Sequence, residues 1–502
     1  MPGQLLADCL NEIFEYLEED KITLHSCLLV NRLWCEVAVR ILWRNIWRFQ
    51  YNVQYNPYPT HVPLSIIGTL IACLPDESKK LLLKNGISIS SPTFKPPIFN
   101  YVSLCKALSI YSLDKMIQNV LEKKPSTTIP SRSLSYNKYL LTQEILKMFI
   151  NEISSLKSLD YCSGRTKDVE NIMFTCLPGT KNCLKDLTEL NCSSDIYSEF
   201  YYQLSQICHN IQILTIEFGD IISNGLTDLI SLQNNLKSVT LKSEDKDGTE
   251  VIASSLTKFS STLTKLIIKE YYIPLSFIAM FINLQELILS FDFKDGLDDF
   301  VQLQYVTFPY LKVLKFLDEC PKAEMLMKFL ELNGKNLKEL YVGNNNNSLN
   351  LSISRFCPNL EKLSTVFMDS EIETLKIILN NCKHLKGINV WCGDEYLNEK
   401  KLLQIIAKYS PKNFRELEMY YIYDVQLEVL PEELEEFFTN WKNRQPQQSL
   451  SIIIIKNYDD CISLEVNRDN MKIIEKYLEI GLVKKFKTKI MHCYDDDYNF
   501  NK

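Results

Sequence analysis

The feature that most constrains the fold of this chain is a six-residue phrase, apolar-x-x-apolar-x-apolar, that recurs along most of its length. The phrase occurs twelve times, for example in NLKSVTL and NLQELIL, and Thr365 is the only weak residue in its last position. Successive phrases begin 21 to 36 residues apart, and most spacings lie between 23 and 29. The phrases begin at Leu156, Leu187, Ile211, Leu236, Leu263, Leu284, Leu311, Leu337, Leu360, Leu385, Phe414 and Leu450. One such unit cannot bury its apolar face alone, so this period predicts stacked repeats that share a continuous core.

Each phrase predicts a short strand whose second and third apolar positions point into the core. A helical segment, such as EIETLKIILNNC, then returns the chain to the start of the next strand. Because neighbouring strands lie about 4.8 Å apart, such a sheet would be roughly 50 Å long along its arc. We therefore expect an α/β fold, a solenoid of about twelve repeats with a concave parallel sheet and convex helices.

A cysteine stands three residues before the phrase in several units, as at Cys208, Cys357 and Cys382. Phe281 and Phe308 occupy the same position in two other units. Metal ligation would not tolerate phenylalanine, so this exchange predicts a buried apolar position rather than a metal site. The pattern resembles the cysteine-containing leucine-rich repeats that are common in F-box proteins.

The first 48 residues predict three short helices. Apolar residues repeat at helical spacing in the first of them, at Leu10, Ile13, Phe14 and Leu17. The third helix carries an apolar stripe that includes Trp34 and is too wide for two short partner helices to cover. Because a module of this size is marginal alone, the rest of the chain or a second protein must cover part of it.

The same stretch resembles an F-box, the adaptor-binding module of SKP–cullin–F-box ubiquitin ligases. The matching residues are DCLNEIFEYL and TLHSCLLVNRLWCEVAVRILWRN, which follow the family pattern L-S-L-V-x-R-x-W and then L-W. One departure is Leu6, which stands where the family usually has proline. The resemblance implies that a SKP-type adaptor is bound through Leu5, Leu6, Leu10, Ile13, Leu17, Leu24, Leu28, Val30 and Trp34. Trp43 and Trp47 are then expected to attach the module to the next part of the chain.

An F-box followed by leucine-rich repeats resembles the substrate-receptor subunits of these ligases, of fungal type. The resemblance implies that the adaptor connects this chain to cullin and RING subunits, while the repeats hold a protein target. Such a subunit places its target near a charged conjugating enzyme and is not itself an enzyme. Two alternatives stay open: a non-degradative scaffold whose N-terminal helices only cap or dimerise the solenoid, and a repeat cavity that senses a small molecule.

In each strand, the residues between the inward apolar positions are expected to face the concave surface. Tyr341, Trp391 and Tyr420 are candidates for an aromatic platform, since tyrosine and tryptophan dominate interface hot spots. Glu416 and Glu418 would add negative charge and favour a basic partner segment. The candidate target-binding residues are Lys315, Tyr341, Asn389, Trp391, Glu416, Glu418 and Tyr420. The alternative is that some of these aromatic side chains pack against each other or against the C-terminal helix.

The organisation predicted from these features has four parts. They are the F-box at residues 1–48, a helical connector or N-terminal part of the solenoid at 49–150, the repeats at 151–456, and a capping helix with an acidic tail at 457–502. The capping helix is expected in DNMKIIEKYLEIGLVKKF, because a solenoid needs a terminal cover. The tail carries Asp495, Asp496 and Asp497, which are expected to stay solvated.

Charge and cysteine usage exclude several classes of function. The net charge of −7 argues against general nucleic-acid binding, which needs surplus lysine and arginine. No run approaches the roughly 18 apolar residues of a membrane-spanning helix. The 16 cysteines are scattered without a CxxC pair, which indicates reduced thiols. We therefore expect a cytoplasmic or nuclear protein that binds neither nucleic acid nor membrane.

No catalytic or metal-binding motif is recognisable in the sequence. The histidines are His25, His61, His209, His384 and His492, and none shows HxxxH or HExxH spacing. The phosphate-binding pattern GxxxxGK(S/T), the dinucleotide pattern GxGxxG and the esterase pattern GxSxG are absent. No catalytic residue, metal ion or cofactor is therefore expected.

Overall fold

The structure is a computed structural model of the 502-residue chain. It describes residues 7–47, 61–87, 97–122, 131–162, 174–243, 249–269, 274–291, 294–421, 429–457 and 463–490. The chain forms two compact units. The first comprises Met1–Leu241 and Asp247–Leu256, and the second comprises Lys242–Lys246 and Thr257–Lys502.

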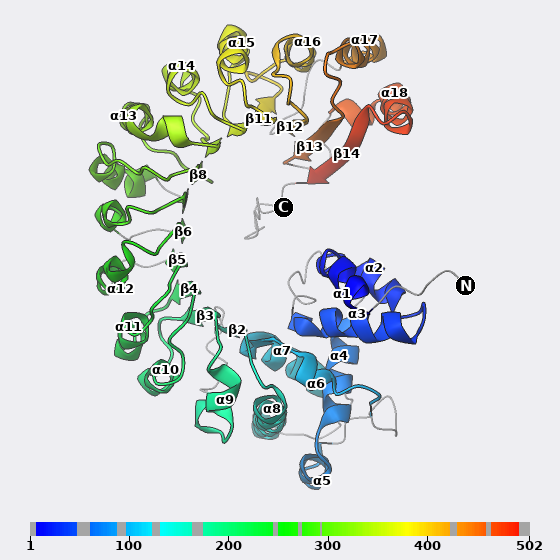
Figure 1. Cartoon of the computed structure of the whole chain (residues 1–502), viewed down its shortest axis with the longest axis vertical. Helices are drawn as coiled ribbons and strands as arrows, with labels where there is room; N and C mark the ends of the chain where they lie inside the picture. The colour runs from blue at the N-terminus through cyan, green and yellow to red at the C-terminus, as the bar shows by residue number, and fades with distance from the viewer. Residues whose placement is uncertain are drawn as a thin grey trace. The chain divides into compact units, whose positions relative to one another are not determined.

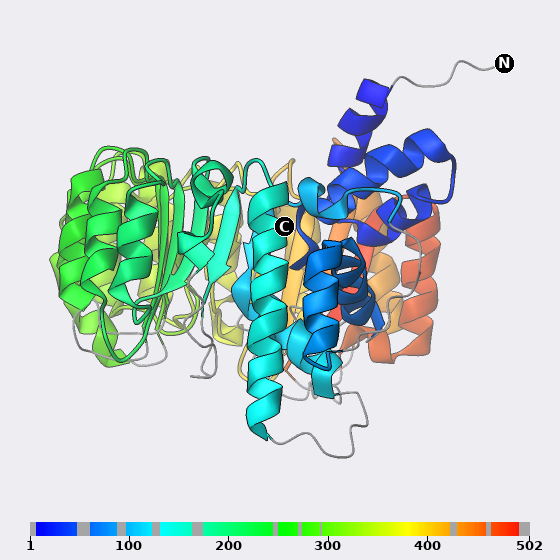
Figure 2. The ribbon, with the colours of Figure 1, turned by 90° about the horizontal axis from the view of Figure 1, so that it is seen from below.

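The first unit begins with helices and continues into the repeats. Its helices are α1 (Ala7–Glu15), α2 (Lys21–Cys27), α3 (Arg32–Arg44), α4 (His61–Cys73), α5 (Asp76–Lys84), α6 (Tyr101–Leu104), α7 (Ile110–Glu122), α8 (Ser131–Glu152), α9 (Thr180–Leu184), α10 (Ser198–Ser205), α11 (Asn224–Ser231) and α12 (Thr249–Leu256). Its strands are β1 (Ala107–Ser109), β2 (Ser158–Tyr161), β3 (Glu189–Ser193) and β4 (Ile213–Phe218), with β5 (Ser238–Ser243) at the division between the units. Figure 1 shows α10 and α11 on one side of this sheet, and the long helix α8 is cyan in Figure 2.

The second unit alternates strands with helices. Its strands are β6 (Lys265–Lys269), β7 (Glu286–Ser290), β8 (Val313–Phe316), β9 (Glu339–Tyr341), β10 (Lys362–Ser364), β11 (Gly387–Cys392), β12 (Glu416–Tyr421), β13 (Leu450–Lys456) and β14 (Val483–Ile490). Its helices are α13 (Ala323–Asn333), α14 (Asn347–Phe356), α15 (Ile372–Asn381), α16 (Glu399–Tyr409), α17 (Pro431–Lys442) and α18 (Arg468–Glu479). Short 3-10 helices take the place of the α-helix after β6 and β7. In Figure 1, α13 to α18 lie on the convex side of these strands.

The twelve sequence phrases all carry strands, from β2 to β13. Within the described residues, the strands follow one another in the sheet in sequence order, and β1 and β14 add one strand at each end. The middle apolar position of each phrase is aligned with that of the next, as Leu340 is with Leu363. Both side chains are buried against the helices. The chain is therefore a leucine-rich-repeat solenoid with the expected α/β organisation.

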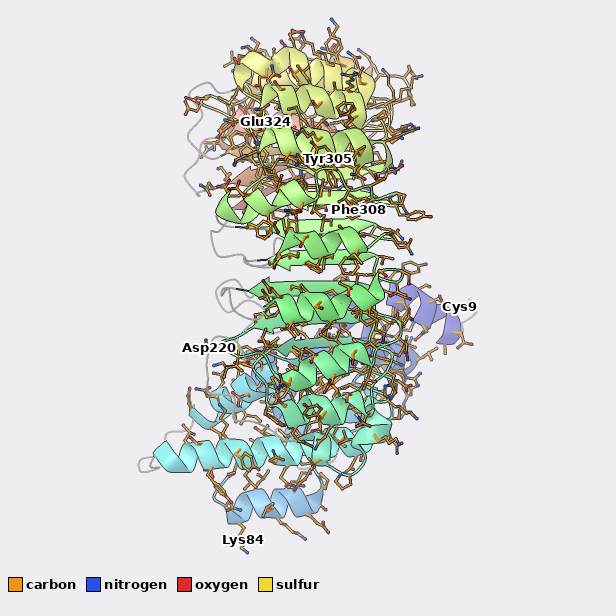
Figure 3. All side chains as sticks on the ribbon, turned by 90° about the vertical axis from the view of Figure 1, so that its left-hand side faces the viewer. Cys9, Lys84, Asp220, Tyr305, Phe308 and Glu324 are labelled. Atoms are coloured by element: carbon orange, nitrogen blue, oxygen red, sulfur yellow. The ribbon has the colours of Figure 1, made fainter. Side chains whose placement is uncertain are left out.

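The position three residues before the phrase is buried in the units that carry cysteine or phenylalanine there, as the exchange of these residues predicted. Cys208, Cys357, Cys382, Phe281 and Phe308 are all fully buried. The thiol of Cys208 donates to the carbonyl of Leu184 at 3.2 Å, and that of Cys382 donates to the carbonyl of Cys357 at 3.4 Å. Cysteine therefore offers each backbone carbonyl a weak donor that phenylalanine lacks. Phe308 is labelled in Figure 3, near the exposed Tyr305.

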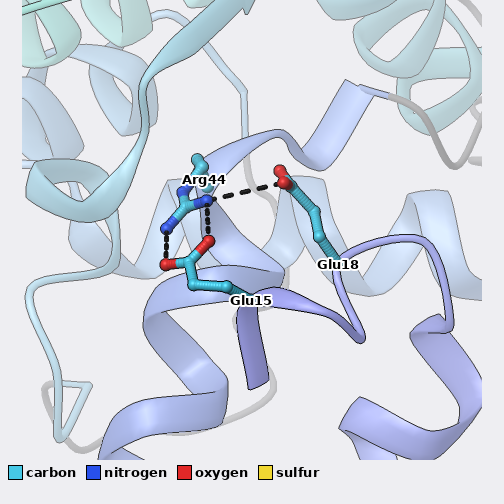
Figure 4. Close-up of polar contacts among 3 residues, drawn as sticks. All are labelled: Glu15, Glu18 and Arg44. Carbon is cyan, nitrogen blue, oxygen red and sulfur yellow. Dashed lines mark hydrogen bonds and ion pairs between the residues drawn. The ribbon is translucent and has the colours of Figure 1, made fainter. Parts of the chain in front are cut away.

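Helices α1, α2 and α3 share a small apolar core of their own. Its buried members are Leu10, Phe14, Leu24, Cys27, Val37, Ala38, Ile41 and Leu42. Asp20 and Asn31 cap the second and third helices, because their side chains accept hydrogen bonds from backbone amides three residues on. The guanidinium of Arg44 donates two hydrogen bonds to Glu15, at 2.7 and 2.6 Å, and lies 3.5 Å from Glu18 (Figure 4). This ion-pair group fastens the end of α3 to the end of α1.

Two tryptophans attach α3 to the first repeat, as expected. The indole Nε1 of Trp47 donates to the carbonyl of Ala107 at 2.7 Å, and its ring lies 6.0 Å from that of Phe149. The ring of Trp43 packs on Tyr101, with centroids 4.5 Å apart. The first strand and the long helix α8 therefore provide the surface on which the helical module is seated.

The C-terminal helix α18 is shorter than the sequence suggested, because it ends at Glu479 rather than continuing into the lysine-rich residues. Gly481 follows with a φ of +72°, a left-handed conformation that only glycine adopts at little cost, and the chain then enters β14. Strand β1 falls inside the predicted connector, and β14 falls inside the predicted C-terminal cap. The four-part division of the chain stays a prediction.

Candidate interaction surfaces

The N-terminal helices expose several large apolar side chains to solvent. Tyr16 is 91% exposed, Leu29 is 81% exposed and Ile22 is 75% exposed, while Ile13 and Val30 are about half exposed. All five lie in α1, in α2 or in the turns that follow these helices. Ile13 and Tyr16 are three residues apart, so they share one side of the first helix. These five are the exposed large apolar side chains among the described residues of α1 to α3 and their turns.

The structure sorts the nine candidate adaptor-binding residues into different environments. Leu5 and Leu6 lie outside the described residues. Leu10 and Leu24 are fully buried in the three-helix core, so they support the surface from below rather than forming it. The others range from partly buried to exposed: Leu17, Leu28 and Trp34 pack against the core, and Ile13 and Val30 are exposed.

Three exposed residues were not predicted from the sequence as adaptor contacts: Tyr16, Ile22 and Leu29. Tyr16 comes just after the last residue of α1, and Leu29 lies in the turn between α2 and α3, where helical periodicity gives no guidance. Trp34 packs against the core, where its ring meets that of Phe14 edge-on with centroids 5.2 Å apart. A signal was present in the unbroken apolar run Cys27 to Val30, which is longer than one helix face can bury.

In the second unit, strand register places the candidate target-binding residues in rows across the concave face. Lys315, Tyr341, Ser364, Asn389, Glu418, Ile453 and Lys487 occupy successive positions of one row. Glu416 lies two residues before Glu418 on the same strand, in a row with Lys362. Trp391 and Tyr420 lie two residues after Asn389 and Glu418, in a row with Ile455. All seven candidates are thus brought to one face, on the four strands β8, β9, β11 and β12.

Charges on this face are largely paired between strands. The ammonium of Lys315 lies 3.0 Å from the carboxylate of Glu339 and 4.4 Å from the ring centre of Tyr341. Lys362 donates to Glu416 at 2.8 Å. Burial is the main cause that raises the pKa of Tyr341, and the neighbouring Glu339 adds to it. Tyr341 is therefore held as a neutral phenol beside a paired lysine.

The aromatic candidates do not form one platform. Trp391 and Tyr420 stack with centroids 5.0 Å apart and planes at 18°. Tyr420 is buried together with Ile453 and Ile455, and Trp391 is partly buried against this group. Tyr341 belongs instead to the contact with Lys315. The alternative that these aromatics pack against each other therefore holds for Trp391 and Tyr420, and the part of Trp391 left exposed is the apolar contact that this group offers.

Glu418 is a partly buried carboxylate on this face. Its pKa is raised, first by burial and second by the nearby Glu416. Lys489, Lys362 and Lys485 act in the opposite direction without cancelling the shift. Of the two carboxylates expected to form a negative patch, one is thus paired with Lys362, and the pKa of the other is raised by burial.

Sequence reasoning also missed a row of three exposed lysines on β14. Lys485, Lys487 and Lys489 are aligned with Ser451, Ile453 and Ile455 of β13, so they lie on the same face as the candidate residues. The signal was the alternation KxKxK, which has the period of a strand and not of a helix.

The strands of the first unit carry a hydrogen-bonded polar ladder on the corresponding positions. Ser109 donates to Asp160 at 2.7 Å, and the amide of Asn191 donates to the same carboxylate at 3.0 Å. The thiol of Cys162 donates to the carbonyl oxygen of Asn191 at 3.0 Å. These polar groups satisfy one another, which makes this row a structural feature rather than a reactive site.

Two other kinds of site have no candidate among the described residues. In that part of the chain, no group of three or more histidine, cysteine, aspartate or glutamate residues is arranged to hold a metal ion. None of the helices described there combines the length and apolarity required to cross a membrane.

No family model matches the chain, and no curated protein matches it. Among solved structures, it is similar to the leucine-rich repeat-containing protein LegL7 from Legionella pneumophila. That similarity has 13% sequence identity and a TM-score of 0.30, and it covers 66% of this chain and 93% of the other. The repeat fold of this chain is established by its own strand order, register and buried leucine positions.

Proposed function

We propose that this chain is the substrate-recognition subunit of a SKP–cullin–F-box ubiquitin ligase. In this role the N-terminal helices bind a SKP-type adaptor, which brings cullin and RING subunits, and the repeats bind a protein target. The chain itself is non-catalytic and acts in the cytoplasm or the nucleus. It raises the concentration of the target near a charged conjugating enzyme, and the transfer chemistry belongs to other subunits.

The observation that carries this proposal is the exposed apolar surface of a helical module with a core of its own. Tyr16, Ile22 and Leu29 are more than 70% exposed, although a buried core lies directly beneath them. A module that served only to cap the first repeat would turn its apolar residues toward that repeat. This one uses Trp43 and Trp47 for that contact and leaves Tyr16, Ile22 and Leu29 in water.

The attachment of the module also suits an adaptor. Trp47 is buried against Phe149, and Lys106 donates a backbone hydrogen bond to the carbonyl of Arg44 at 2.8 Å. A module fastened at several points holds its bound adaptor at a defined angle to the first repeat. Defined placement is what a ligase needs, because a target lysine must reach the conjugating enzyme.

The test is binding of a purified SKP-type adaptor to the full-length chain, measured by titration calorimetry. Leu29→Glu places a charge on the exposed surface without touching the core, and should weaken adaptor binding on the order of tenfold or more. Ile221→Glu is the matched control, since Ile221 is 70% exposed and lies after β4, away from the N-terminal helices. The control should bind as tightly as the parent chain.

Point variants are preferable to removal of residues 1–48. That deletion would also uncover Phe149 and the carbonyl of Ala107, and would perturb the first repeat. Adaptor binding that is unaffected by Leu29→Glu, or equally reduced by both variants, would contradict the proposed role. The chain would then be better described as a repeat scaffold whose N-terminal helices are a cap.

A further inference from the structure

The last strand of the second unit presents a row of positive charge to the concave face. Lys485, Lys487 and Lys489 alternate along β14 and are all exposed. Alternate residues of a strand point to the same side, about 6.6 Å apart along its length. We call these three residues the lysine row. Strand β14, drawn in red in Figure 1, is the last in the order of the sheet, so no described strand lies along its outer side.

The lysine row differs from the other lysines on this face because, within the described part of the chain, its positive charges are not balanced by ion pairs. Lys315 is paired with Glu339, and Lys362 is paired with Glu416. Among the described residues, no ion pair involves a member of the lysine row. By register, Glu416 lies two strands from Lys485, and Glu418 lies two strands from Lys487. Glu416 is already paired with Lys362, and Glu418 is partly buried. Three exposed ammonium groups therefore face one carboxylate that is already paired and one that is partly buried.

An apolar group adjoins the lysine row. Ile453 and Ile455 lie on β13, opposite Lys487 and Lys489, and they pack with Tyr420. Trp391 covers the far side of this group and keeps part of its ring in solvent. The end of the concave face thus offers a row of cations beside an aromatic edge.

We propose that the lysine row and Trp391 together bind an extended acidic segment of a partner protein. Aspartate or glutamate at every second position of such a segment would match the spacing of the lysines, because both chains have the repeat of a strand. An apolar side chain of the segment would lie on the exposed part of Trp391. This inference deepens the proposed function, since it names the chemistry of the target that the repeats recognise.

The proposal reverses the charge that the sequence suggested for the partner. Glu416 and Glu418 favoured a basic segment, but Lys362 neutralises the first, and the second is partly buried. The chain as a whole carries a net charge of −7, so a local cationic row does not make it a general binder of anions. Recognition would depend on local geometry and weaken at high salt, where exposed charges are screened.

The test uses the full-length chain and a fluorescein-labelled peptide with glutamate at every second position and a terminal phenylalanine. Binding is measured by fluorescence anisotropy at low and high salt. Lys485→Gln/Lys487→Gln/Lys489→Gln should weaken binding on the order of tenfold, the combined effect of three exposed charge pairs. A matched control changes the same charge at exposed lysines outside the α-helices and strands of the same unit: Lys335→Gln/Lys383→Gln/Lys412→Gln. The control variant should bind like the parent.

Several outcomes would overturn the inference. Equal weakening in both triple variants would make the effect one of net charge. Equal binding of a glutamine or lysine version of the peptide would remove the requirement for acid, and equal affinity for a single-stranded oligonucleotide would indicate an unselective anion surface. Binding that appears only in a chain truncated after Ile490 would assign the surface to the chain's own C-terminal residues.

The adaptor experiment keeps this inference separable from the proposed function. The lysine triple variant should bind a SKP-type adaptor with unchanged affinity, because the altered residues lie in the second unit. Loss of peptide binding with normal adaptor binding supports the inference. A chain that binds the acidic peptide but no adaptor would leave the inference standing and reject the ligase role.

Discussion

The indole nitrogen of Trp47 donates a hydrogen bond to the backbone carbonyl of Ala107, 2.7 Å away, in buried surroundings. Trp47 follows the last helix of the N-terminal module, and Ala107 is the first residue of β1. One side chain thus joins a helical module to the first strand of a repeat array. The same ring packs on Phe149 of α8, so the contact is both polar and apolar.

Replacing Trp47 should destabilise the first unit. Trp47→Phe keeps a ring against Phe149 but leaves the carbonyl of Ala107 without its donor, at a cost of about 1–3 kcal/mol in the free energy of unfolding. Urea denaturation followed by far-UV circular dichroism measures this loss. Trp43→Phe is the control, because it preserves an aromatic contact with Tyr101 and should cost less. Equal losses in the two variants would contradict the importance of the hydrogen bond.

The ion pair between Arg44 and Glu15 should make the module less stable in acid. The hydrogen bonds from Arg44 hold the pKa of Glu15 below its ordinary value of 4.5. A lowered folded pKa contributes stability above the unfolded pKa, and this contribution is lost as the pH falls through the folded value. Arg44→Gln should therefore cost about 0.5–1 kcal/mol at pH 7, a small value because both side chains are about one-third exposed. Denaturation curves should converge below pH 4.5, and a constant difference at all pH values would contradict this account.

Glu418 should show the opposite dependence on pH. Its pKa is raised by burial, so protonation favours the fold, and stability is lost as the pH rises through the folded pKa. Glu418→Gln removes this penalty and should raise the free energy of unfolding at pH 7, by an amount on the order of 0.5 kcal/mol. The gain should vanish below pH 4.5, where both states of the parent are protonated. A destabilised variant at pH 7 would show that the ionised carboxylate makes a favourable contact.

Trp391 should matter for stability as well as for binding. Trp391→Ala removes one ring of the stack with Tyr420 and uncovers Ile453 and Ile455, so it should cost about 1–2 kcal/mol. Differential scanning calorimetry measures the change. Tyr305→Ala is a control, since that ring is 66% exposed and outside the stack. An unchanged melting temperature for Trp391→Ala would mean that the stack contributes nothing to the folded state.

Thiol reactivity should divide the cysteines by burial. Burial raises the pKa of Cys192, Cys208 and Cys382 to about 12, so these thiols are protonated at neutral pH and out of reach of reagents. Cys9 and Cys176 are exposed, and Cys9 is labelled on the surface in Figure 3. Iodoacetamide labelling with peptide mass spectrometry should modify Cys9 and Cys176 within minutes. Comparable labelling of Cys208 in the native chain would show that the repeats open readily.

Local patterning predicted the repeats well, because the spacing of leucines determines both strand and burial. The cysteine position also followed from sequence, since Phe281 and Phe308 share its environment with Cys208. Trp43 and Trp47 lie at the end of the helical module, and their contact with the next domain was predictable from that place.

Features that depend on several strands at once were not predictable. Lys362 reaches Glu416 across an intervening strand, and no spacing in the sequence announces that pair. Because Trp391 stacks on Tyr420, these two rings are largely covered rather than exposed as a binding platform. In the N-terminal module, periodicity identified the apolar residues but not their depth: Leu10 is buried, whereas Tyr16 is exposed.

The glycine turn after α18 has a consequence for how copies of this molecule behave in solution. Gly481 lets the chain reverse and lay down β14, whose outer backbone edge is open within the described part of the fold. An open edge invites a second copy to continue the sheet, yet lysine at four of the eight positions of this strand would set like charges against each other in such a pair. The described sheet therefore ends in a strand that repels its own kind, which disfavours edge-to-edge pairing of two copies through β14.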